Sequence, residues 1–187
     1  MRSGDPGGLR SRLHAATREL HRRLDLTVEG AAPLSSPAGY AAFLTAQQHA
    51  RVALQGRFGG LAPDAAWAAR MDAHGAALLG DLRELRAGAV DLPAASVAPD
   101  ASAGWGVVYV LEGSTLGGPV LRRRVAAALG PRVPVRFLSL GDGSIRRLGV
   151  DLEACRDPES AVAAAVGAFE VFLAVFGATF SNGRPDP

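Results

Sequence analysis

Two stretches of the sequence hold side chains whose types and spacing are suited to chemistry. The first surrounds His21, one of four histidines in the chain. Residues three or four positions apart share one face of a helix, so the spacing predicts a polar strip beside a leucine stripe. The strip consists of His14, Thr17, Arg18, His21 and Asp25. An ordinary solvent-exposed helix face has the same spacing, and this alternative stays open.

His21 is the best candidate for a metal ligand in this strip. Asp25 follows it by one helical turn, where a carboxylate can accept the ring N–H, fix the tautomer and raise the basicity of the imidazole. Arg18 precedes it by one turn, where a guanidinium can grip a carboxylate of a bound cofactor. A lone histidine is more often a surface or core residue than a ligand, so the spacing alone does not decide.

The second stretch is rich in glycine inside a helical pattern. Residues 107–121 read VVYVLEGSTLGGPVL. Each glycine costs a helix about 1 kcal/mol and proline costs more, so a compensating role is expected. Gly113 and Gly117 are four positions apart and leave one helix face without side chains. Either another helix packs closely there, or a flat cofactor lies against the backbone. Glycine and proline also predict a kink.

Both stretches resemble signature motifs of heme oxygenases. Residues 16–21 read ATRELH and resemble the A-T-K/R-x-x-H motif on the first helix of that family. Residues 109–118 read YVLEGSTLGG and resemble the distal helix, most closely in the bacterial branch linked with bacteriophytochromes. Two motifs in the expected order match one family, which is more specific than either motif alone.

The resemblance implies an all-α, single-domain bundle with heme b between the first helix and a kinked, glycine-rich distal helix. His21 would be the axial ligand of the heme iron, and the glycines would let the distal helix lie over the heme. The implied cofactor-binding residues are His21, Thr17, Arg18, Asp25, Tyr109, Gly113 and Gly117. The implied catalytic residues are Gly113, Gly117 and Ser114.

The implied reaction cleaves heme to biliverdin, iron and carbon monoxide with O2. Electrons would come from a ferredoxin, a flavodoxin or ascorbate, and the bilin could pass to a bacteriophytochrome. Arginines 122–124 either dock an acidic electron donor or form a solvated turn. Ser114 departs from the family, because animal members carry an aspartate there that anchors water. Glu112 and Thr115 are alternative candidates for proton delivery.

Two other functions remain open from the sequence. The first is a heme carrier or sensor that has the same pocket but does not turn heme over. The second is a helical interaction module that binds no heme. Spectral conversion of the heme complex to a bilin under reducing conditions would distinguish an enzyme from a carrier.

The elements that must position these residues are predicted to be helices. The sequence is rich in alanine, which favours helices, and no segment alternates with the period of a β-strand. We expect an all-α single domain. Its predicted helices cover residues 8–26, 37–58, 64–86, 100–129 and 144–154, and a last helix starts at Pro158. Residues 88–100 and 132–143 are predicted to be irregular, with Asp100 capping the helix that follows.

Length and composition set the wider expectations. The chain has 187 residues, a net charge of +2 and no lysine, and Cys155 is its sole cysteine. We therefore expect no internal disulfide and a cytoplasmic protein without a signal peptide. Residues 161–180 are predicted to be a buried helix rather than a membrane span. We expect no nucleic-acid or membrane partner, and a domain over residues 9–180 between flexible ends, 1–8 and 181–187.

Overall fold

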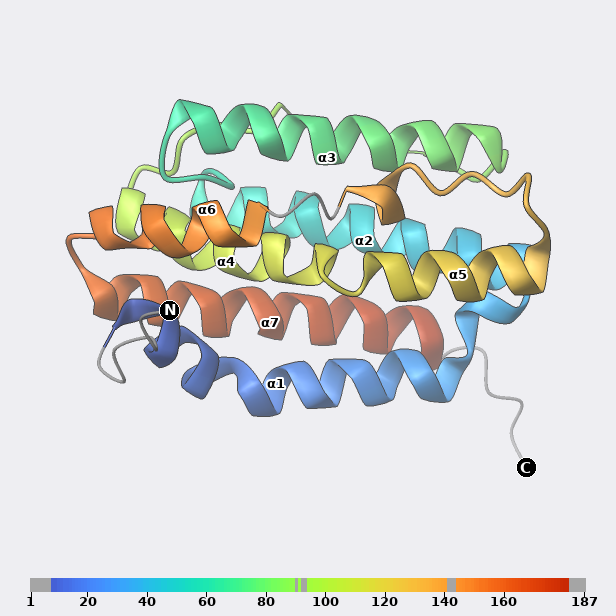
Figure 1. Ribbon diagram of the computed structural model, residues 1–187, viewed down its shortest axis with the longest axis horizontal. Coiled ribbons are helices and arrows are strands. Elements are labelled where there is room, and N and C mark those ends of the chain that lie inside the picture. Colours follow the sequence, from blue (N-terminus) through green and yellow to red (C-terminus); the bar gives the residue numbers. More distant parts are fainter. Residues whose placement is uncertain (1–7, 90, 92–93, 141–143, 182–187) are drawn as a thin grey trace.

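The computed structural model describes residues 8–89, 91, 94–140 and 144–181, and these ranges contain seven α-helices and no β-strand (Figure 1). The helices are α1 (Leu9–Ala31), α2 (Pro37–Phe58), α3 (Ala65–Glu84), α4 (Ala101–Thr115), α5 (Gly118–Leu129), α6 (Ser144–Asp151) and α7 (Pro158–Ser181). Buried side chains from all seven form one hydrophobic core. The expected all-α single domain is confirmed. Residues 1–7 and 182–187 of the expected flexible ends lie outside the described residues.

Local side chains define where several helices begin. Ser36 accepts a hydrogen bond from the backbone N–H of Gly39, which starts α2 directly before Pro37. Asp64 accepts the N–H of Trp67 at the start of α3. Asp100 accepts the N–H of Ser102 at the start of α4, as predicted. Such caps satisfy N–H groups that have no partner inside the helix.

The first helix is longer than predicted. It was expected to end at residue 26, but α1 continues to Ala31. No glycine or proline interrupts residues 27–29, and Val28 packs against the core, so nothing stops the helix there. It ends where Ala32 takes a left-handed conformation, with φ of 43°, and donates its N–H to the carbonyl of Glu29.

The expected helix over residues 100–129 is broken into two, and this corrects the prediction of one continuous element. The break lies at Leu116 and Gly117, between α4 and α5, at the position where a kink was predicted. Pro119 has no N–H and cannot continue the hydrogen-bond ladder of α4, but it fits the first turn of α5. Figure 1 shows α4 and α5 following each other along the same side of the bundle.

Helix α7 lies between the two elements that carry the motifs. It packs against α4 and α1, and also against α2. The backbones of α4 and α7 approach closely at Gly106, where an added Cβ would lie 2.0 Å from the carbonyl oxygen of Ala161. A real side chain does not fit at that distance, so glycine is required there. This contact fixes the position of α4 relative to α7.

The composition of α7 matches two kinds of helix. The segment Pro158–Phe180 is long and apolar enough to cross a membrane, with a mean hydropathy of 2.1. Core helices of compact proteins meet the same criteria. In the structure, its buried face includes Ala164, Ala168 and Phe172, and this face contributes to the single core.

Candidate functional site

A cleft of about 1840 Å³ lies between α1 and the α4–α5 pair. Aromatic side chains of α7 contribute to its lining, among them Phe169 and Phe172. Figure 1 shows α1 and the α4–α5 pair on opposite sides of α7. All eight residues singled out from the two motifs line this cleft. They are Thr17, Arg18, His21, Asp25, Tyr109, Gly113, Ser114 and Gly117.

His21 is oriented by a carboxylate and by an aromatic ring. Its Nδ1 lies 2.9 Å from Oδ2 of Asp25, one turn further along α1. Its ring meets the ring of Phe169 edge to face, with centroids 5.8 Å apart. When the imidazole is neutral, the Nδ1–H donates to Asp25, so Nε2 keeps its lone pair. This is the arrangement of a metal-ligating histidine with a carboxylate partner.

The other histidines have different surroundings. His14 lines the same cleft from α1, but no ion pair or hydrogen bond orients it within the described part of the chain. His49 is exposed on α2 and lies outside the cleft lining. His74 is buried, with Nε2 3.3 Å from Oε1 of Glu112. Within the described ranges, no three His, Cys, Asp or Glu side chains are grouped to hold a bare metal ion.

Two glycines open the opposite wall of the cleft. A Cβ added at Gly113 or Gly117 would meet no atom within 4 Å beyond its own helix and its chain neighbours. The helix-packing alternative for this pair is therefore wrong, because no neighbouring helix contacts these positions. Close backbone packing occurs instead at Gly106, whose Cβ would collide with α7, and at Gly118, whose Cβ would lie 2.5 Å from the carbonyl of Leu138.

The polar residues around Gly113 point in different directions. The hydroxyl of Ser114 donates to the carbonyl of Leu111, 2.7 Å away, and Ser114 lines the cleft. Glu112 is fully buried, and its carboxylate receives a hydrogen bond from Arg70 Nε at 2.5 Å. The hydroxyl of Thr115 donates to the backbone carbonyl of Glu112 at 2.8 Å. Neither Glu112 nor Thr115 lines the cleft, so Ser114 is the one of these three that can contact a ligand there.

Tyr109 and Thr17 connect the two walls. Thr17 is buried on α1, and its hydroxyl donates to the carbonyl of Leu13 at 2.8 Å. The two side chains also share a hydrogen bond. Burial raises the pKa of the Tyr109 phenol, while the bond with Thr17 and the positive charge of Arg10 oppose the rise. The phenol is thus protonated at neutral pH.

Three arginines that the motifs did not identify also line the cleft. They are Arg10, Arg124 and Arg146. Arg10 could have been found, because it precedes His14 by one turn and extends the polar strip of α1. Arg124 belongs to the arginine run of residues 122–124, whose other two members do not line the cleft. Arg146 comes from α6, and no local pattern indicates that α6 borders this cleft.

The cleft thus joins a histidine–carboxylate pair on one wall to two side-chain-free positions on the other, with four arginines around it. Such an arrangement suits a large, flat, partly apolar ligand that carries negative groups and a metal. Comparison with models of known protein families, with curated proteins and with solved structures gave no match for this chain.

Proposed function

We propose that the protein binds heme b in this cleft and cleaves it to biliverdin, iron and carbon monoxide. The observation that carries the proposal is the meeting of the two motifs across one cavity. His21 with its Asp25 partner lies on one wall, and the open backbone of Gly113 and Gly117 lies on the other. The same two motifs carry the resemblance to heme oxygenases.

The residues present fit such a ligand. The space in front of Gly113 and Gly117 is open, and any larger side chain at these positions would project into it. The rings of Phe169, Phe172 and Phe176 offer apolar surface along the cleft. Four arginines of α1, α5 and α6 could bind the two heme carboxylates through their guanidinium groups. They are Arg10, Arg18, Arg124 and Arg146.

The protein's own contribution would be to bind heme, to orient it and to exclude competing reactions. When bound, heme supplies the iron redox chemistry that activates O2. His21 would donate Nε2 to the iron, and Asp25 would hold the proton on Nδ1. The wall of the cleft at Gly113 and Gly117 would leave space beside the ligand for small molecules only. The Ser114 oxygen keeps a lone pair after its hydroxyl donates to Leu111, so it can accept a hydrogen bond from water in the cleft.

Electrons must come from outside, since the sequence carries no flavin or nicotinamide motif. An acidic ferredoxin or flavodoxin would suit the exposed arginines 122–124, and ascorbate would serve in solution. On the same proposal the protein is cytoplasmic, and its bilin could pass to a bacteriophytochrome. If reduction by a protein donor keeps its salt dependence after these three arginines are neutralised, they are not the docking site.

A second candidate function, a heme carrier or sensor without turnover, is favoured by one observation. Glu112 is the acidic residue next to Gly113, but it does not line the cleft, and its carboxylate is bound by Arg70. Ser114 carries no charge and no proton that it releases readily. If water in the cleft does not deliver protons, the protein would hold heme unchanged.

Hemin titration followed by ascorbate tests the proposal. We expect saturable binding of one heme per chain, followed by loss of the Soret band and growth of a bilin spectrum. His21→Ala should lose the spectrum of the histidine-ligated complex, whereas His14→Ala, from the same cleft, should keep it. Stable ferrous heme would favour the carrier. Failure to bind, or equal spectra for the two variants, would refute the proposed site.

A further inference from the structure

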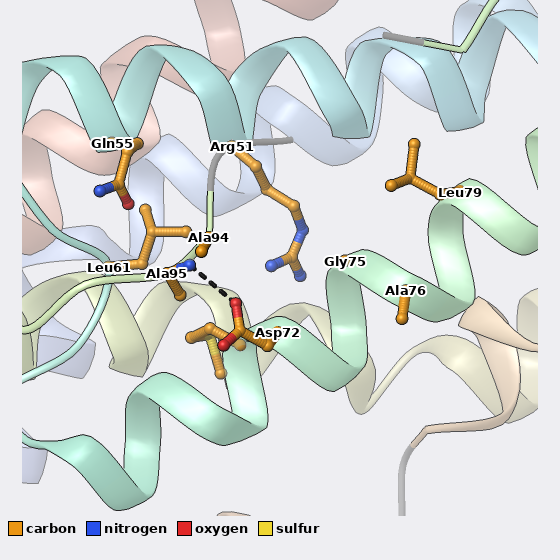
Figure 2. A pocket seen from close by; sticks show the side chains of 10 residues that line it. Arg51, Gln55, Leu61, Asp72, Gly75, Ala76, Leu79, Ala94 and Ala95 are labelled. Atoms are coloured by element: carbon orange, nitrogen blue, oxygen red, sulfur yellow. Dashed lines mark hydrogen bonds between the residues drawn. The ribbon is translucent and has the colours of Figure 1, made fainter. Parts of the chain in front are cut away.

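A second cavity lies between α2, α3 and the segment around Ala95 (Figure 2). Its volume is about 210 Å³, and it shares no lining residue with the cleft of the proposed heme site. The walls are mostly apolar, with contributions from Leu61, Met71 and Leu79. The cavity is therefore a separate space, and what it binds does not depend on the proposed function.

A buried arginine lines this cavity. Arg51 is 1% exposed, and Figure 2 shows its guanidinium directed from α2 toward α3, near Gly75 and Asp72. Its Nε and Nη1 have no hydrogen-bond partner among the described residues. Its Nη2 lies 3.4 Å from Nδ1 of His74, and the guanidinium lies over the ring of Phe137 at 5.6 Å. Two buried N–H-bearing nitrogens thus lack an acceptor, which is costly in a protein interior.

The charges around Arg51 do not balance within the interior. Burial lowers the pKa of Arg51 to about 10, and the charge of Glu112 opposes the decrease, so the side chain is a cation at neutral pH. Glu112 is already bound by Arg70 and Ser144, so one buried carboxylate faces two guanidinium groups. Asp72 also lines the cavity, but it is exposed, and its Oδ1 accepts the N–H of Ala95 at 2.7 Å.

We propose that this cavity binds a small monocarboxylate anion, with Arg51 as its ligand. The planar guanidinium presents two pairs of parallel N–H groups that match the two oxygens of a carboxylate, Nε with Nη2 and Nη1 with Nη2. Each pair includes one of the two unpartnered nitrogens of Arg51. The apolar walls suit a short hydrocarbon tail, which limits the ligand to the size class of acetate, propionate and butyrate. An anion here would supply the missing negative charge beside Arg51.

Thermal unfolding of the intact protein in sodium acetate, propionate or butyrate tests this. Ionic strength is kept constant with sodium chloride, and sodium gluconate serves as a carboxylate too large for the cavity. We expect the midpoint of unfolding to rise with the logarithm of the concentration of the short carboxylates. The rise should reach roughly 5–10 °C at a hundredfold excess over the Kd. Gluconate should produce no such rise.

Two variants test separately whether binding needs the charge of Arg51 and whether it needs the volume of the cavity. Arg51→Met removes the guanidinium and should abolish the carboxylate-dependent rise. Ala76→Phe keeps the guanidinium but places a ring where Ala76 lines the cavity, and it should abolish the rise as well. Ala76 is exposed, so this variant is expected to fold even if Arg51→Met does not.

Three outcomes would overturn the proposal. Equal rises in the wild type and in the Ala76→Phe variant would place binding elsewhere on the protein. An equal rise in gluconate would show a general effect of the salt. The absence of any rise in the wild type would mean that the cavity holds only water.

Discussion

Nδ1 of His21 lies 2.9 Å from Oδ2 of Asp25, and both residues line the cleft between α1 and the α4–α5 pair. The pair is formed within one helix, so its geometry does not depend on how distant parts of the chain pack. Both side chains are more than half exposed, which makes the pair a minor contributor to the stability of the fold. Its value would lie in orienting the imidazole toward a ligand.

Replacing Asp25 tests this orienting role. We expect Asp25→Ala to weaken heme binding by about 10–100-fold, because a ligating histidine that loses its carboxylate partner loses basicity and a fixed tautomer. Titration with hemin, followed by absorbance, measures the change. Glu19→Ala is the matched control, because Glu19 is an exposed carboxylate on the same helix that pairs with Arg22 and lies outside the cleft. Equal affinities of the two variants would contradict the prediction.

Gly113→Ala is expected to affect stability and binding in opposite directions. The new methyl group meets no atom within 4 Å, so the fold accepts it. Alanine is favoured over glycine inside a helix, and the free energy of unfolding should rise by about 0.5–1 kcal/mol. The same methyl group projects toward the proposed ligand, so the affinity for heme should fall. Urea unfolding without heme, together with hemin titration, measures both effects.

Gly106→Ala is the control for this substitution on the same helix. An added Cβ would lie 2.0 Å from the carbonyl oxygen of Ala161, so α4 and α7 would have to separate. We expect the free energy of unfolding to fall by about 1–3 kcal/mol, the usual range for overpacking. If both alanine variants shift stability in the same direction, the assignment of Gly113 to open space would be wrong.

Gly117 provides a test of the reaction rather than of binding. A larger residue, as in Gly117→Leu, would extend into the cleft from the break between α4 and α5. If this wall selects the carbon of heme that is attacked, the variant should slow turnover or change the bilin isomer. Separation of the bilin isomers by chromatography after reaction with ascorbate measures both. An unchanged rate and product would mean that Gly117 does not face the reacting edge of the ligand.

The sequence was most informative where one helix determines the geometry. The spacing of His21 and Asp25 predicted a pair that the structure contains, because four residues make about one helical turn. The starts of α2, α3 and α4 were also predictable, because caps act over three residues. The break at Leu116 and Gly117 was anticipated as a kink but not as the end of a helix.

Features that depend on packing between helices were not predictable. Nothing in the local sequence shows that Arg146 of α6 borders the cleft, or that the guanidinium of Arg51 is buried between α2 and α3. The direction of Glu112 was equally undetermined. It follows from the position of α3, which brings Arg70 and His74 to its carboxylate.

Glu112 should therefore act in stability rather than in proton delivery. Its carboxylate is fully buried and bound by Arg70, His74 and Ser144, so Glu112→Gln removes the negative charge that pairs with Arg70 and attracts the buried Arg51. Removing one partner of such a buried pair costs about 3–5 kcal/mol, and urea unfolding should show a loss of this size. The exposed control is Glu170→Gln, whose partner Arg57 lies 3.4 Å away and whose loss should cost under about 1 kcal/mol.

Heme turnover per folded molecule of the Glu112→Gln variant decides between the two roles of this residue. Because Glu112 does not line the cleft, heme turnover per folded molecule should remain close to that of the wild type. A proton-delivery role predicts the opposite result, a loss of turnover that persists after correction for the folded fraction. Single-turnover reactions with ascorbate, at a temperature where both proteins are fully folded, separate the two because stability then has no influence on the rate.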